Sequence, residues 1–181
     1  MNRDIAALAF CALVLSGLGC PPAQAATPLT TEPHFDRAAY LGRWYQIALI
    51  PNRFQAQCVG DTSADYSALP ENLLQVTNRC RTEGGQQQAI GVARPHREHP
   101  DNPAILQVRF APAWLSFLPF VWGDYWVIQT LGHYDAALVG SPDRQYLWIL
   151  ARTPTLDDAR YAALVATAKA QGFDVSQLRR E

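Results

Sequence analysis

Charged residues are scarce in this sequence, and neither sign dominates. Of its 181 residues 17% are charged, and 15 Lys and Arg stand against 16 Asp and Glu, for a formal net charge of −1. Nucleic-acid-binding domains usually carry a strong basic patch, so we expect no nucleic-acid partner. The chain also lacks G-x-S-x-G, H-E-x-x-H and P-loop motifs. We therefore expect neither a catalytic site nor a cofactor.

Long apolar runs are few as well. The run from Ile5 to Leu18 follows Arg3 and is too short to cross a membrane comfortably. Ala23-Gln24-Ala25 then offers small residues at the two positions that a signal peptidase reads. We expect an exported chain with a signal peptide over residues 1–25, a linker over 26–34 and one domain over 35–181.

Cysteine occurs four times. Cys11 lies within the apolar run, and Cys20 ends Gly17-Leu18-Gly19-Cys20, which also fits a bacterial lipoprotein box. In that alternative the signal ends at residue 19 and a lipidated Cys20 anchors the protein to a membrane; both interpretations stay open. Cys58 and Cys80 remain, an even pair in an oxidising compartment, and we expect them to form a disulfide.

Two distant strands are apolar on both faces. One follows Gly42 and runs from Trp44 to Ile50; the other is Tyr146–Arg152. Pairing them antiparallel with Trp44 opposite Arg152 sets Gln46 against Leu150, Ala48 against Trp148 and Ile50 against Tyr146. Trp44, Gln46, Ala48 and Ile50 then share the inner face. A first strand that pairs with the last closes a sheet into a barrel.

Gly42-Arg43-Trp44-Tyr45, together with an arginine at the end of the last strand, resembles the signature of the lipocalin family, and of its bacterial outer-membrane members in particular. The resemblance implies an all-β fold: an eight-stranded antiparallel up-and-down closed barrel with one C-terminal α-helix packed outside. It implies that Gly42, Trp44 and Arg152 have structural roles at the closed end. Most lipocalins carry Thr-Asp-Tyr where this chain has Gly132-His133-Tyr134, so an expected acid is missing there.

The strands between these two read as hairpins. Cys58–Ser67 and Asn72–Arg81 alternate at period two, with a turn at Leu69-Pro70-Glu71. Centring that hairpin on Leu69 sets Tyr66 against Asn72 and Cys58 against Cys80, as a cross-strand disulfide requires. Thr155–Gln171 reads as an amphipathic helix with a capping box at its start.

The inner positions of the barrel form a mostly apolar set that suits an acyl chain or another lipophile. The ligand-binding residues that we predict are Phe54, Thr62, Tyr66, Val76, Asn78, Ile90, Val92, Leu106, Val108, Phe110, Tyr146 and Trp148. The resemblance implies the same ligand class, fatty acids and lysophospholipids, and a role in envelope lipid storage or transport. The alternatives are a lipocalin-type enzyme acting on a bound lipophile, with Cys58 as its inward nucleophile, and a partner-binding envelope protein with a filled barrel.

The uncharged stretch Pro112–Trp122 is a loop, because two prolines interrupt it. It lies at the mouth opposite Trp44, and its rings suit a ligand portal, a membrane contact, a homodimer interface or an inward-folded lid. The predicted mouth-loop rings are those of Trp114, Phe117, Phe120 and Trp122, and the predicted mouth cations, suited to a phosphate or carboxylate head, are Arg53, Arg81 and Arg144.

His96-Arg97-Glu98-His99 invites comparison with a metal site. Pro100 prevents a helix that would bring both histidines to one face, so we expect a solvated turn and no metal.

Overall fold

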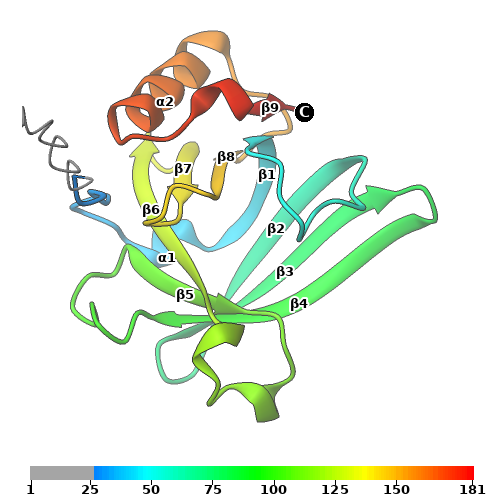
Figure 1. Cartoon of the computed structure of the whole chain (residues 1–181), viewed down its shortest axis with the longest axis vertical. Coiled ribbons are helices and arrows are strands. Elements are labelled where there is room, and N and C mark those ends of the chain that lie inside the picture. The colour runs from blue at the N-terminus through cyan, green and yellow to red at the C-terminus, as the bar shows by residue number, and fades with distance from the viewer. Residues whose placement is uncertain (1–26) are drawn as a thin grey trace, which may run out of the picture.

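The computed structural model describes residues 27–181 (Figure 1). The predicted signal peptide and Cys20 lie outside the described residues. The helices are α1 (Arg37–Tyr40) and α2 (Asp158–Ala170), with 3₁₀ turns at Ala113–Leu115, Pro119–Val121 and Val175–Gln177. The strands are β1 (Gly42–Leu49), β2 (Gly60–Leu69), β3 (Leu73–Thr82), β4 (Gly85–Pro95), β5 (Ile105–Arg109), β6 (Gly123–Leu131), β7 (Ala136–Gly140), β8 (Leu147–Ala151) and β9 (Arg179–Arg180).

Strands β1 to β8 form a closed antiparallel barrel, as predicted. Each pairs with the next, and β1 pairs with both β2 and β8. Helix α2 packs on the outer face, as Figure 1 shows. Asp157 caps it by accepting a hydrogen bond from the amide of Arg160. The helix therefore begins at Asp158, three residues later than the start at Thr155 that we expected.

The pairing of β1 with β8 begins in the predicted register and then slips. Tyr45 pairs with Ala151 and Gln46 with Leu150, but a bulge sets Ala48 against Ile149. A one-residue slip turns later side chains to the other face. Ala48 and Ile50 accordingly lie in the apolar cluster beneath α2, so their predicted inner placement was wrong.

The β2–β3 hairpin is centred two residues later than predicted. Tyr66 pairs with Val76 and Ala64 with Asn78. The turn includes Glu71 and Asn72, both with left-handed backbone at φ 59° and 60°. We had placed the turn around Pro70, but Asn adopts this conformation readily and so the turn extends further.

The disulfide between Cys58 and Cys80 is present, with the two Cα atoms 5.6 Å apart. Cys58 precedes β2, so the bond joins a loop to a strand rather than two paired strand positions.

Strand β4 presents the face opposite to the one we predicted. Its Gly91 and Ala93 pair with the inward residues Val76 and Leu74, so Ile90 and Val92 point outward. Small residues face inward because the wall is crowded here. A Cβ on Gly91 would lie 2.7 Å from Cδ1 of Phe110 and from the carbonyl oxygen of Arg109.

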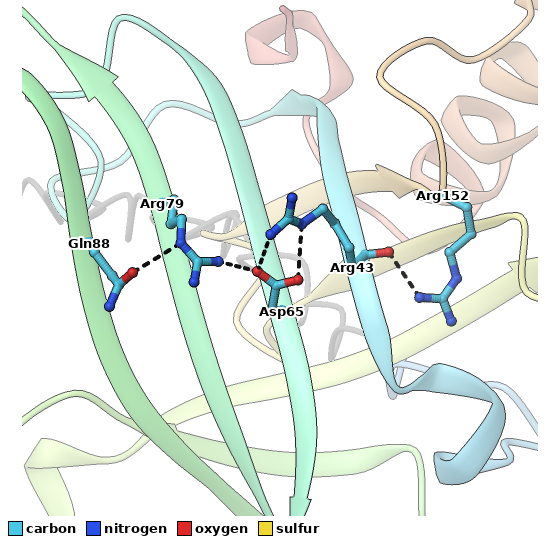
Figure 2. Close-up of polar contacts among 5 residues, drawn as sticks. All are labelled: Arg43, Asp65, Arg79, Gln88 and Arg152. Atoms are coloured by element: carbon cyan, nitrogen blue, oxygen red, sulfur yellow. Dashed lines mark hydrogen bonds and ion pairs between the residues drawn. The ribbon is translucent and has the colours of Figure 1, made fainter.

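A row of polar side chains crosses the outer face of the barrel where β1 meets β2 (Figure 2). Asp65 accepts from Arg43 Nε at 3.0 Å and Nη2 at 2.9 Å, and also from Arg79. Arg79 donates onward to Gln88 on β4 at 3.0 Å. The hydrogen bond from Arg43 holds the pKa of Asp65 below its usual value. The row joins four neighbouring strands, β1 to β4, including the pair β1 and β2 where the barrel closes.

Residues 27–34, predicted to be a linker, lie against the barrel. Leu29 is buried in the cluster beneath α2, and the amide of Glu32 donates to the carbonyl of Val127. Burial of Leu29 offers an apolar contact that a free tether would lack. Among residues 27–181, no helix is both long and apolar enough to cross a membrane.

Candidate functional site: the barrel interior

The closed end of the barrel is sealed by Trp44 and Arg152, as predicted. Trp44 is fully buried, and the guanidinium of Arg152 lies 3.9 Å from its ring centre. The indole Nε1 donates to the carbonyl of Tyr40 at 2.8 Å. Gly42 has a φ of 93°, a conformation that favours glycine, and an added Cβ would lie 3.5 Å from Nη1 of Arg152.

An aromatic layer lies above this seal. The rings of Tyr40 and Trp44 are 4.7 Å apart, and those of Tyr40 and Tyr66 are 5.2 Å apart. The hydroxyl of Tyr125 on β6 lies 2.7 Å from those of Tyr40 and Tyr66. Burial raises the pKa of Tyr66 to about 12 and the pKa values of Tyr40 and Tyr125 well above the ordinary value. The floor is therefore aromatic, hydrogen-bonded and uncharged.

On the walls formed by β5 and β8, the exposure of the inner side chains rises from the closed end to the mouth. On β5 and at the residue that follows it, Leu106 is 1% exposed, Val108 is partly exposed and Phe110 is 42% exposed. On β8, buried Leu150 is likewise followed toward the mouth by partly exposed Trp148, whereas on β3 partly exposed Asn78 is followed by buried Cys80 and Thr82. The lower half of the barrel is packed with side chains, whereas the upper half is open to solvent along β5 and β8. This is the geometry of a cup.

Aromatic rings continue up one wall of the cup. Trp148 stacks on Tyr146 at 6.0 Å between ring centres, and Tyr146 contacts Phe54 at 5.6 Å. Three of the predicted ligand residues thus lie together, although Phe54 is largely exposed at the rim.

A polar chain crosses the same half of the cup. Trp148 Nε1 donates to Gln55 Oε1 at 2.8 Å, and Gln55 Nε2 donates to Gln46 Oε1 at 2.8 Å. Gln46 and Thr62 both donate to the carboxylate of Glu181, Thr62 at 3.0 Å. Glu181 reaches this position because β9 pairs with β1 beyond the point where β2 leaves it. The predicted residue Thr62 is thus buried in a polar contact.

A cavity of about 320 Å³ opens at the rim where β5 leaves β4. The predicted residues Ile90, Val92 and Phe110 line it, together with Arg109 and Pro112. Ile90 and Val92 therefore border a rim cavity, not the interior of the cup.

The loop that follows β5 carries the predicted exposed rings. Trp114, Phe117 and Phe120 are 73%, 69% and 80% exposed, so the loop does not fold inward as a lid. Figure 1 shows it extending away from the barrel between β5 and β6. Trp122 differs from the other three: the guanidinium of Arg94 lies 3.6 Å from its ring centre, and its Nε1 donates to the carbonyl of Ser116.

The predicted mouth arginines are largely engaged by protein groups. Arg81 pairs with Asp61 at 2.7 Å. Arg144 donates to the carbonyls of Gln171, Pro142 and Thr27, which makes it a structural contact and not a head-group ligand. Arg53 lies 5.0 Å over the ring of Phe54.

The cysteine and histidine clusters are also explained by protein contacts. Cys58, the inward nucleophile of the enzyme alternative, is bonded to Cys80. His96, His99 and Glu98 hold possible ligand atoms within 4.8 Å of one another. His96 is buried, contrary to a solvated turn: its Nδ1 accepts from the amide of Glu98, and its Nε2 lies 3.2 Å from Asp124.

Comparison with known proteins identifies the family. Residues 35–181 match the model of the lipocalin-like domain. The chain belongs to the lipocalin family. Lipocalins bind small hydrophobic ligands, and the lipocalins similar to this chain are generally binding and transport proteins.

Several relatives are similar in sequence. Temperature-induced lipocalin-1 of Arabidopsis thaliana is 39% identical over 142 residues, covering 78% of this chain and 75% of its own. The outer membrane lipoprotein Blc of Escherichia coli K12 is 38% identical over 151 residues, covering 82% and 80%. Apolipoprotein D of Mus musculus is 29% identical over 156 residues, covering 81% and 76%.

Solved structures agree with the fold. Lobster apocrustacyanin A1 superposes with a TM-score of 0.63 at 18% identity, covering 80% of this chain and 78% of its own. Insecticyanin from the tobacco hornworm Manduca sexta gives a TM-score of 0.61 at 18% identity, covering 85% and 82%.

Three polar residues of the interior were missed by our sequence analysis, and Gln46 was placed on the inner face but not named as a site residue. Tyr125 stands at an inward position of its strand, so period-two alternation could have found it. Gln55 and Glu181 enter through loop and terminal contacts, which leave no local pattern in the sequence.

Proposed function

We propose that this chain binds a fatty acid or a lysophospholipid in the open half of its barrel and stores or transports it in the cell envelope. The observation that supports this most is the exposure gradient, in which the inner wall is sealed at Leu106 and accessible at Val108 and Phe110. A mostly apolar cup of this kind buries an acyl chain, and each buried methylene contributes about 0.8 kcal/mol before ordering costs.

Native mass spectrometry of protein purified from its own envelope tests this proposal. We expect an added mass in the lipid range that organic extraction removes, with one lipid per chain. Protein that carries no added mass before extraction, and takes up neither lipid class afterwards, would instead favour a partner-binding role with a filled barrel.

The envelope location is part of the proposal. The E. coli relative is named an outer membrane lipoprotein, and a disulfide such as Cys58–Cys80 persists in oxidising compartments. Mass spectrometry of the mature N-terminus distinguishes a chain that begins at Ala26 from one that begins at a diacylated Cys20. A chain that still begins at Met1 would exclude both forms of export.

We further propose that the loop after β5 contacts a membrane surface. The exposed rings of Trp114, Phe117 and Phe120 suit the apolar boundary of a bilayer, where aromatic side chains are favoured. Arg94, which is partly exposed, stacks on Trp122 at the base of the loop and places a cation where anionic head groups would lie. This combination favours a lipid surface over a second copy of the chain.

A further inference from the structure

Three tyrosine hydroxyls meet at the boundary between the packed floor and the open half of the cup. Tyr125 contributes the central oxygen, 2.7 Å from Tyr40 Oη and 2.7 Å from Tyr66 Oη. Tyr40 is fully buried and Tyr66 is 5% exposed, whereas Tyr125 keeps partial exposure. Because Tyr125 pairs with the inward residue Leu106, its remaining exposure is toward the lumen.

Counting protons shows that one donor is left over. Three phenols bring three O–H groups, and the contacts between them use two. A leftover proton on Tyr40 or Tyr66 would be a buried donor without a partner, which is costly. The favoured arrangement has Tyr40 and Tyr66 both donating to Tyr125, whose own proton then points toward the lumen. Two incoming hydrogen bonds polarise that O–H and make it a better donor.

The charge around this donor restricts what it can bind. Burial keeps all three phenols neutral, because it raises their pKa values. Arg152, whose charge acts on Tyr40, lies on Trp44 at the closed end and donates to backbone carbonyls. A carboxylate at the floor would be desolvated against a neutral donor, which is unfavourable. A neutral carbonyl, hydroxyl or protonated carboxyl group loses much less on desolvation.

We propose that the hydroxyl of Tyr125 is a ligand anchor at the floor of the cup, and that it selects lipophiles whose leading end carries a neutral hydrogen-bond acceptor. This rests on the proposed lipid-binding function and refines it. A fatty acid can enter carboxyl-first in its protonated form, whereas a lysophospholipid that enters tail-first presents a methyl group to Tyr125. The anchor therefore favours fatty acids, fatty alcohols and long-chain ketones over lysophospholipids.

Displacement of the neutral fluorophore N-phenyl-1-naphthylamine from delipidated protein tests the anchor. The competitors are decanol, a ketone of the same chain length, and chlorodecane, which has a similar shape and a poor acceptor. We expect Tyr125→Phe to weaken decanol and ketone binding by about three- to tenfold, the range for one neutral hydrogen bond, and chlorodecane binding by less than twofold. Tyr161→Phe, on α2 outside the barrel and away from the lumen, is the matched control.

Each outcome has one interpretation once thermal unfolding shows that the variants fold. Equal loss for all three competitors, or none for decanol, overturns the anchor and leaves lipid binding standing. Failure of the wild type to exchange any competitor overturns both. If Tyr125→Phe does not fold, Tyr66→Phe replaces it. The anchor then predicts a smaller loss of affinity, still confined to decanol and the ketone. An equal loss of affinity for all three competitors contradicts the anchor.

Discussion

The guanidinium of Arg152 both covers the ring of Trp44, 3.9 Å from its centre, and donates to the backbone carbonyls of Ala39, Arg43 and Tyr134. One side chain thus joins the end of α1, the start of β1 and the turn between β6 and β7 at the closed end of the barrel. His133 stands where the family usually has an acid, and here the arginine is satisfied by backbone oxygens instead.

Replacing Arg152 should destabilise the barrel from this end. Arg152→Met removes a cation–π contact worth about 1–2 kcal/mol and three hydrogen bonds, so we expect a net loss of about 2–3 kcal/mol. For a domain of this size that corresponds to a melting temperature lower by roughly 4–12 °C. Arg152→Lys keeps the charge but loses the planar guanidinium, so its melting temperature should lie between those of the wild type and Arg152→Met. Calorimetry checks this; a loss below about 0.5 kcal/mol for Arg152→Met would contradict the role of this side chain.

Asp65 should make stability depend on pH in the acid range. Its pKa is lowered in the fold by the hydrogen bond from Arg43, so its contribution is fully present above the ordinary value of about 4 and is lost as the pH falls through the folded value. Because both ion pairs are partly exposed, we expect Asp65→Asn to cost only about 1 kcal/mol at pH 7.

Thermal unfolding at pH 7 and pH 3 measures this dependence. The difference between the wild type and Asp65→Asn should shrink at the lower pH, while Glu83→Gln, in an exposed turn, serves as the control. A difference that stays constant between the two pH values would contradict the assigned ion pairs.

The floor tyrosines should ionise late. Because the folded pKa of Tyr66 is about 12, the folded state keeps its proton while the unfolded chain loses it near pH 10. The resulting stabilisation is complete below about pH 10 and is lost as the pH rises toward 12. Absorbance titration at 295 nm should show a late, unfolding-linked phase that Tyr66→Phe reduces. A single phase near pH 10 in folded protein would exclude a sealed floor.

The loop after β5 should bind lipid surfaces. Replacing Trp114, Phe117 and Phe120 together with Ser removes three exposed rings and should lower partitioning to anionic vesicles at least tenfold, because each ring contributes apolar area at the interface. Vesicle sedimentation measures this, and unchanged melting would show that the fold is intact. Wild-type protein that does not bind vesicles but dimerises through this loop would contradict the membrane assignment.

The sequence was sufficient for the seal of the barrel, because Trp44, Gly42 and Arg152 combine a family signature with alternating strands. The sequence was not sufficient to predict which side chains point into the barrel where a shift of one residue reverses the two faces of a strand. The bulge before Ala48 leaves no pattern in the local sequence. Gly91 faces inward next to the ring of Phe110, a contact between β4 and the residue after β5 that the sequence of β4 alone does not reveal. The tyrosine group assembles from α1, β2 and β6, so it exists only once the barrel has closed.

The most direct test of the lipid-carrier account is native mass spectrometry of delipidated protein titrated with a fatty acid and with a lysophospholipid. Ala64→Trp places a large ring inside the cup, and Ser67→Trp places the same ring on the outer face of β2. The account predicts one lipid per chain for the wild type and Ser67→Trp, and at least about tenfold weaker binding for Ala64→Trp, because several methylenes lose their burial. Equal lipid binding by the two tryptophan variants would contradict it.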